Sequence, residues 1–293
     1  MDDLPYLFCD AVAGSISDIC GFSNQIELFE NSNFSTWKSA FKDHNSKRTK
    51  FAVKIGSINC SWSYQFYKLD AKEGEARLYD FKTIQQLRRK YLQITIVGCT
   101  DNRKRFKSSF EEIEEITKFI SPFLNLVTLN LYNKQIGEMH LSSLLSHFRN
   151  DHCQIYSLTV DQYRKCYKDL LFSQLCFDFL EYLDIKGVNW PKKVQWGLEE
   201  FVLRKSFKFV FCAESNFVFQ KSFFEKLFEL PRPKKEMSLY GKFSLDLKEL
   251  KEFKKELQVQ LVNYTYTWKR EDGVHVYLND CSDHNLYIHI APQ

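Results

Sequence analysis

Glycine and proline are scarce in this chain, with 10 and 6 residues among 293. Disordered and low-complexity chains are usually rich in both, and this chain instead has 44% hydrophobic and 16% aromatic residues. Charge of one sign is also lacking, because 41 basic residues stand against 37 acidic ones. The composition therefore predicts a folded chain with a sizeable core, and its weak basic excess does not favour a nucleic-acid-binding protein.

Long apolar runs and cysteine pairs are absent as well. No stretch approaches the roughly 20 apolar residues that span a bilayer. The N-terminal apolar run contains Asp10 and follows Asp2 and Asp3, so it lacks the basic region of a secretory signal peptide. None of the nine cysteines forms a CxxC pair, and most lie in apolar runs. We therefore expect no disulfide framework and no membrane partner, and we expect a cytoplasmic or nuclear location.

Motifs for catalysis are also missing. The chain has no P-loop, no GxGxxG after a predicted strand, no GxSxG and no HExxH. Histidines gather at 140–152 and 275–289, but neither group has zinc-finger spacing, and positions on a helix face and in strands explain them better. A cysteine–histidine nucleophile pair stays open in principle, because such partners are distant in sequence. We expect no enzyme activity, no catalytic residue, no metal and no cofactor.

From about residue 91 the chain alternates between β-rich and amphipathic segments. Strands are predicted to start near residues 91, 126, 154, 180 and 207, each followed by a helix. The helices are expected over 110–119, 139–148, 163–177, 194–203 and 219–230. A strand–helix unit of roughly 26–35 residues is typical of a solenoid, in which stacked neighbours complete each other's core.

The strand sequences add detail to this prediction. "LVTLNLYN" (126–133) and "LEYLDIKG" (180–187) fit the LxxLxLxxN-like frame of a leucine-rich repeat, and "IYSLTVDQ" (155–162) fits it more loosely. The frame's asparagine becomes Gly187 in one copy and Gln162 in another. An ordinary α/β domain with a parallel sheet remains the alternative. After a polar break at 231–235, residues 243–257 are predicted to be partly helical and 259–290 to form a β-rich C-terminal cap.

The first 48 residues have a different pattern. Apolar residues at helical spacing predict a first helix over 4–20, and Pro5 suits its first turn. A short second helix is expected at 24–30, and a third, which carries Trp37, near 34–45. A hairpin of strands at 51–55 and 62–67 follows.

This N-terminal segment resembles an F-box. The resemblance is carried by Leu4-Pro5, by the apolar first helix and by Trp37 in "FSTWKSAF". The opening "LPYLFCDAVAGSI" is similar to the nematode-expanded F-box-like paralogues, and the later repeats resemble the leucine-rich or related domains of F-box proteins. The resemblance implies an α/β fold class with two domains: a three-helix F-box-like module at 1–48, and a leucine-rich-repeat-like, substrate-binding solenoid with a β-rich cap at 49–293.

The resemblance also implies a function. The protein would be the substrate-recognition subunit of a Skp–cullin–F-box ubiquitin ligase and would bind a Skp-type adaptor, and through it a cullin. The adaptor-binding residues would be Leu4, Pro5, Phe8, Val12 and Trp37. Candidate substrate-binding residues are strand-end side chains and aromatic residues expected to be exposed: Tyr132, Asn133, Gln162, Asn189, Trp190 and Asn216. The alternative is a stand-alone protein-binding module, such as an inhibitor or antidote of one partner, without ligase coupling.

Overall fold

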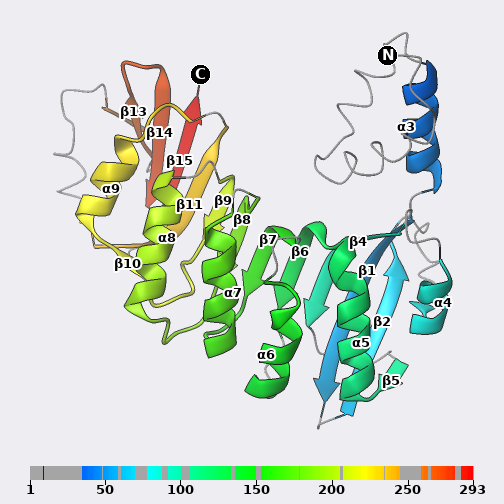
Figure 1. The fold of residues 1–293 in the computed structure, drawn as a ribbon. Helices are drawn as coiled ribbons and strands as arrows, with labels where there is room; N and C mark the ends of the chain where they lie inside the picture. The colour runs from blue at the N-terminus through cyan, green and yellow to red at the C-terminus, as the bar shows by residue number, and fades with distance from the viewer. Residues whose placement is uncertain are drawn as a thin grey trace. The chain divides into compact units, whose positions relative to one another are not determined.

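The protein has a mixed α/β fold (Figure 1). A computed structural model describes residues 9, 35–47, 49–58, 61–69, 78–87, 92–99, 106–132, 136–149, 153–177, 179–204, 207–233, 235–244, 259–262, 265–280 and 285–292. The chain divides into two compact units, Met1–Ile155 and Tyr156–Gln293. Among the described residues, no helix combines the length and the apolar character needed to cross a bilayer.

The first unit is built on a hairpin that the sequence predicts. β1 (Thr49–Ile58) pairs with β2 (Ser61–Lys68) antiparallel, while β4 (Leu92–Cys99) joins β1 and β6 (Asn125–Leu131) joins β4 in parallel. The strand order is β6-β4-β1-β2-β3, and β5 also pairs with β2. The remaining elements are α3 (Ser35–Lys47), β3 (Leu78–Tyr79), α4 (Phe81–Gln86), β5 (Phe106–Ser108), α5 (Phe110–Ile120), η2 (Ser121–Phe123) and α6 (Glu138–Ser146).

Local sequence explains the principal helix of this unit. The α5 helix begins after Ser109, whose hydroxyl accepts a hydrogen bond from the backbone N–H of Glu112 at 3.2 Å. Its buried face carries Ile113, Ile116 and Ile120 at helical spacing. The predicted helix over 110–119 and the predicted strand over 126–131 are therefore confirmed within a residue at each end.

The second unit contains the most regular repeats. Its strands follow the order β12-β13-β14-β15-β11-β9-β8-β7, and β10 also pairs with β11. The elements are β7 (Gln154–Val160), α7 (Lys165–Leu175), β8 (Tyr182–Ile185), α8 (Lys192–Arg204), β9 (Phe209–Phe211), β10 (Val218–Phe219), α9 (Lys221–Phe228), β11 (Met237–Phe243), β12 (Val259–Val262), β13 (Thr265–Lys269), β14 (Val274–Asp280) and β15 (Asn285–Pro292). The helices α7, α8 and α9 lie side by side on one face of this sheet (Figure 1).

The strand spacing is more regular than the sequence suggested. Strands β6, β7, β8, β9 and β11 start at residues 125, 154, 182, 209 and 237, which are 29, 28, 27 and 28 residues apart. The apolar frame positions are buried and lie in register across neighbouring parallel strands: Leu158, Leu183, Val210 and Leu239. Sequence analysis did not predict β11, because the prolines at 231 and 233 suggested that the repeats end there.

A glycine takes the asparagine position of the frame where two repeats stack closely. Gly187 has φ of +82°, a conformation that residues with a Cβ rarely adopt. A Cβ at this position would lie 2.8 Å from the backbone Cα of Gln162 in the preceding repeat. Its N–H donates to the Glu214 carbonyl of the following repeat at 3.0 Å. The positive φ and the close contact with the preceding repeat therefore explain why a glycine stands at this position.

The C-terminal strands extend the sheet beyond the repeats. β11 pairs with β9 in parallel and with β15 antiparallel, and β12 to β15 form an antiparallel meander. The β-rich C-terminal tail is thus confirmed. The predicted helix start at Phe243 is wrong, because Phe243 ends β11, where it pairs with Phe219 of β10. The rest of that predicted helix, 245–257, lies outside the described residues.

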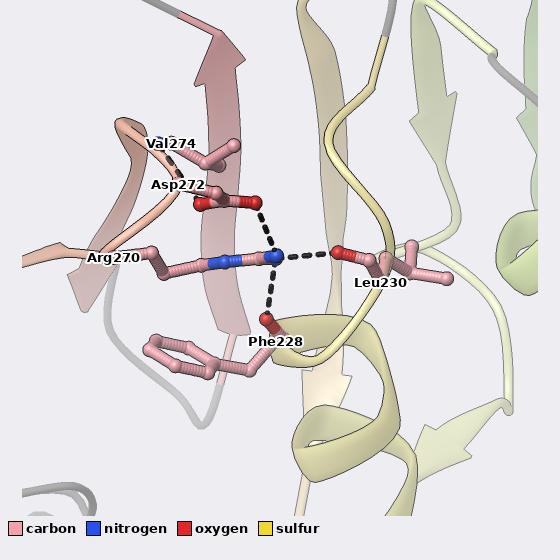
Figure 2. Close-up of polar contacts among 5 residues, drawn as sticks. All are labelled: Phe228, Leu230, Arg270, Asp272 and Val274. Carbon is pink, nitrogen blue, oxygen red and sulfur yellow. Dashed lines mark hydrogen bonds and ion pairs between the residues drawn. The ribbon is translucent and has the colours of Figure 1, made fainter.

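Arg270 fastens the meander to the last helix (Figure 2). Its Nη1 donates to the backbone carbonyls of Phe228 and Leu230, at 2.8 and 2.5 Å, where α9 has ended. Its Nη2 pairs with Asp272 at 2.7 Å, and the other carboxylate oxygen of Asp272 accepts from the Val274 N–H at 3.2 Å. The guanidinium therefore supplies a donor to the Phe228 carbonyl, which the helix end leaves without an intrahelical partner, and to the Leu230 carbonyl just beyond the helix.

Candidate binding surface

One face of the second unit's sheet is left open by its helices. The helices α7, α8 and α9 cover the face that carries the buried frame residues, and no described helix of this unit lies on the opposite face (Figure 1). In β8, β14 and β15 the side chains alternate between fully buried and half-buried. Since successive side chains point to opposite faces of a strand, these half-buried side chains and their neighbours in register define the surface that we call the open face. Two of its members, Thr159 and Ser238, are buried, with 8% of each exposed.

The open face consists of two rows of side chains that cross seven strands in register. The first row contains Ser157, Tyr182, Phe209, Ser238, His289, Tyr277 and Thr267. The second row contains Thr159, Asp184, Phe211, Tyr240, Tyr287, Asn279 and Thr265. Six of these fourteen side chains are tyrosine or phenylalanine, so the solvent-facing side of the sheet is as aromatic as many protein-binding surfaces.

The aromatic rings contact one another along and between the strands. Phe209 and Phe211 stack with centroids 6.4 Å apart, and Phe211 lies 5.1 Å from the ring of Tyr240. Farther along the rows, Tyr287 stacks on His289 at 6.4 Å with an angle of 5° between the rings. These contacts restrict the rotamers of the large side chains on the open face.

Hydrogen bonds fix the polar members of the open face. The Ser238 hydroxyl lies 3.0 Å from the Tyr287 hydroxyl and 3.0 Å from Nδ1 of His289. On β14, Nδ1 of His275 lies 3.2 Å from the Tyr277 hydroxyl. These contacts restrict the orientations of the serine, tyrosine and histidine side chains on the open face.

Two lysines and a glutamate border the open face at the amino ends of the strands. Lys208 Nζ lies 2.8 Å from the Glu181 carboxylate and 3.1 Å from the Tyr156 hydroxyl, and it sits over the Tyr182 ring at 5.6 Å. Lys235 pairs with the other oxygen of Glu181 at 2.7 Å. The hydrogen bonds that Lys208 donates to Glu181 and to Tyr156 raise the pKa of Lys208. Burial acts to raise the pKa of Glu181, but the hydrogen bonds and the charges of both lysines together outweigh it and lower that pKa.

Asp184 lies on β8, between Thr159 of β7 and Phe211 of β9, and its charge is less well compensated than that of Glu181. Its Oδ2 is 4.0 Å from Lys186 Nζ, which lies closer to Glu214 at 3.2 Å. Its Oδ1 is buried and has no hydrogen-bond partner among the described residues. Burial raises the pKa of Asp184, the charge of Lys186 lowers it and the charge of Glu214 raises it.

The predicted substrate-binding residues lie mostly at the loops that follow the strands. Tyr132, directly after β6, is 42% exposed, as expected for a surface aromatic. Gln162 lies against Gly187 of the next repeat. Asn189 is exposed and has φ of +72°, a left-handed conformation that asparagine tolerates better than most residues. Asn133 lies outside the described residues.

Trp190 is a correction to the sequence analysis. We expected an exposed aromatic, but only 3% of Trp190 is exposed, and its ring packs against those of Tyr163 and Phe217 at 5.2 and 6.1 Å. Asn216 holds the same loop, because its amide accepts from the Trp190 N–H at 2.9 Å and donates to the Trp190 carbonyl at 3.1 Å. The two residues thus join successive repeats.

Of the predicted adaptor-binding residues, the structure describes only Trp37. It lies in the first turn of α3, which confirms a helix over the predicted range, and its side chain is half-buried. Leu4, Pro5, Phe8 and Val12 lie outside the described residues.

The histidine groups follow their strands and helices. His140, on α6, packs on Phe110 at 4.3 Å and on Trp62 at 5.6 Å, as an aromatic side chain on a helix face would. Among the described residues, no group of three or more histidine, cysteine, aspartate or glutamate side chains could hold a metal ion. Burial raises the pKa of the Cys153 thiol to about 12, which makes it a poor nucleophile.

Comparison of the chain with protein-family models, with curated proteins and with solved structures found no match. The fold and the surface therefore define the class of this protein, a mixed α/β protein whose second unit presents an open aromatic sheet face.

Sequence analysis missed the open face, although the signal was present. The aromatic residues occupy the variable positions of the repeat frame, as in "EYLD" and "KFVF". They stand directly beside the apolar positions from which the strands were predicted. A surface strand needs no aromatic residues at such positions, so tyrosine and phenylalanine in successive repeats would have indicated a binding face.

Proposed function

We propose that this protein is the substrate-recognition subunit of a Skp–cullin–F-box ubiquitin ligase, in which the open face of the second unit binds the protein substrate. The observation that carries the substrate-binding part is the pair of aromatic rows that cross seven strands. Tyrosine and other large aromatics supply most of the binding energy at many protein interfaces, and here they stand on rigid strands.

The near-constant repeat length and the buried, in-register frame residues support a leucine-rich-repeat-like solenoid as the architecture behind this face. The ligase part rests on the F-box resemblance of residues 1–48, and α3 with Trp37 supports it. In this proposal the chain performs no chemistry itself. It raises the effective concentration of a bound substrate beside the ligase.

Adaptor binding can be tested by co-expression with a recombinant Skp-type adaptor, followed by affinity purification of the full chain. We expect the wild-type chain to retain the adaptor and Phe8→Asp to lose it. Met139→Asp is the matched control, since Met139 is 84% exposed on α6 and takes the same apolar-to-acidic change. A wild-type chain that recovers no adaptor would overturn the ligase part and leave a stand-alone binding protein.

The open face can be tested separately by affinity purification from cells in which cullin activity is blocked. Phe211→Ala combined with Tyr240→Ala removes the ring pair at the centre of the second row. We expect the proteins captured by the wild-type chain to be reduced at least about 30-fold, because such anchors contribute about 2 kcal/mol or more. Trp196→Ala, on the helix face where Trp196 is 62% exposed, should leave capture unchanged. Loss of capture with Trp196→Ala alone would move the binding surface to the helices.

A further inference from the structure

We propose that the open face holds an arginine or lysine side chain of the partner protein, with its cationic group on the Asp184 carboxylate and its stem against Phe211 and Tyr240. This inference rests on the proposed function only in taking the open face as the surface that binds a protein.

The position of Asp184 is the first argument. It is the only carboxylate in the two rows, and its row neighbours are Thr159 of β7 and Phe211 of β9. Along the chain its open-face neighbours are Tyr182 on β8 and Lys186 directly after β8. About 31% of the side chain is still exposed, so a partner's side chain can reach it.

The local charge is the second argument. Two carboxylates, Asp184 and Glu214, share Lys186, and the shorter contact goes to Glu214, at 3.2 Å against 4.0 Å. A partly buried carboxylate without a close cation or enough donors is costly to ionise, and a second cation would remove that cost. A group that compensates the charge of Asp184 must therefore be positively charged.

The rings beside Asp184 suit a cation as well. Lys186 Nζ already lies over the Phe211 ring at 5.4 Å, which shows that this ring accepts a positive charge on its face. The neighbouring Tyr240 ring lies 5.1 Å from that of Phe211 and enlarges the aromatic surface beside Asp184. A guanidinium can stack on such rings while its N–H groups pair with a carboxylate, and an ammonium can do so as a point charge.

The cations of the face near Asp184 do not offer an equivalent site for an acidic partner residue. Lys208 and Lys235 both pair with Glu181 at 2.8 and 2.7 Å. Lys242, on β11, donates to the Ser215 carbonyl at 3.1 Å. Charge complementarity therefore selects a basic side chain as the anchor of the partner on this part of the face.

The test uses N-acetyl-arginine amide as the probe and N-acetyl-citrulline amide as its neutral isostere. The ring signals of the full-length protein, labelled with ¹³C-phenylalanine, are followed by NMR, and Phe211 is assigned with Phe211→Leu. We expect the arginine probe to shift the Phe211 signal with a dissociation constant on the order of millimolar. Asp184→Asn should weaken binding about tenfold, as expected for an ion pair combined with a cation–π contact.

Two controls decide the outcome. Glu200→Gln removes an exposed carboxylate from α8 and should leave the titration unchanged. The citrulline probe should bind at least about tenfold more weakly than the arginine probe. Equal binding of both probes, equal binding by Asp184→Asn, or no saturable shift of Phe211 would overturn the cation site. None of these results bears on adaptor capture, so the proposed function would stand or fall separately.

Discussion

The two faces of the second unit's sheet are made from the same strands but follow different rules. On the helix-covered face, each repeat places leucine, isoleucine or valine at the same frame position, and these side chains are almost fully buried. On the open face, the residues at equivalent positions change from serine to tyrosine, phenylalanine and histidine from strand to strand. Residue types recur on the helix-covered face because each repeat packs against its neighbours there. Residue types vary on the open face because packing within the fold places fewer demands on them.

The difference indicates which face carries the stability of the unit and which face, in our proposal, binds a partner. Burial of a frame leucine removes its whole side chain from water and fills a site that cannot collapse. An open-face tyrosine keeps contact with water and gains only cross-strand contacts. We therefore expect changes on the helix-covered face to unfold the protein and changes on the open face to remove a partner.

The largest predicted effect breaks the helix-covered face. Leu183→Ala removes a side chain that is 1% exposed and lies between Leu158 and Val210. We expect it to lower the free energy of unfolding by about 3 kcal/mol, because it leaves a cavity in the packed layer. Tyr182→Ala, one residue earlier on the open face, should cost about 1 kcal/mol or less. Urea titration followed by tryptophan fluorescence measures both, and equal costs would contradict the distinction between the faces.

A smaller effect is expected where the helix layer is fastened to the meander. Arg270→Met keeps the apolar stem and leaves the carbonyls of Phe228 and Leu230 without their guanidinium donor. We expect a loss of about 2 kcal/mol, as for hydrogen bonds to a charged group. Hydrogen exchange in the last turn of α9 should speed up first. Lys269→Met, at the neighbouring exposed lysine, serves as the control. A similar loss in the free energy of unfolding there would mean that the Arg270 contacts in Figure 2 do not stabilise the end of α9.

Periodicity predicted much of the fold, and the physical reason is the helix-covered face. Strand and helix positions from residue 91 to 230 follow from apolar residues that recur at strand and helix spacing, and the structure places them within a few residues. β11 was missed because the segment with Pro231 and Pro233 was interpreted as a polar break that ends the repeats. Both prolines lie in the loop before β11 and do not interrupt the strand. Local breaker residues cannot reveal that the next segment pairs with a strand 28 residues earlier.

The candidate surface was less accessible to sequence analysis. Trp190 was expected to be exposed because it follows a strand end, but it fills the space between Tyr163 and Phe217. Sequence analysis assigned no role to Asp184, because only the strand register shows that it lies beside Phe211 and the ring pair that Phe211 forms with Tyr240. Which side chains share a face depends on pairing between repeats, and a single sequence does not state that pairing.

The smallest predicted effect compares two carboxylates on the open face. Because the lysine contacts lower the pKa of folded Glu181, its ion pairs stabilise the protein above the ordinary value near 4.5 and lose that effect as the pH falls. Glu181→Gln should therefore destabilise the protein by about 0.5 to 1 kcal/mol at pH 7, with the difference vanishing in acid. The pKa of Asp184 is raised, so its ionised form lowers the free energy of unfolding instead of raising it. We therefore expect Asp184→Asn to be neutral or slightly stabilising at pH 7, and this gain should also vanish in acid. Thermal unfolding from pH 3 to 7 measures both. Destabilisation by Asp184→Asn at pH 7 would mean that the carboxylate is already satisfied within the chain, and that it needs no partner's cation.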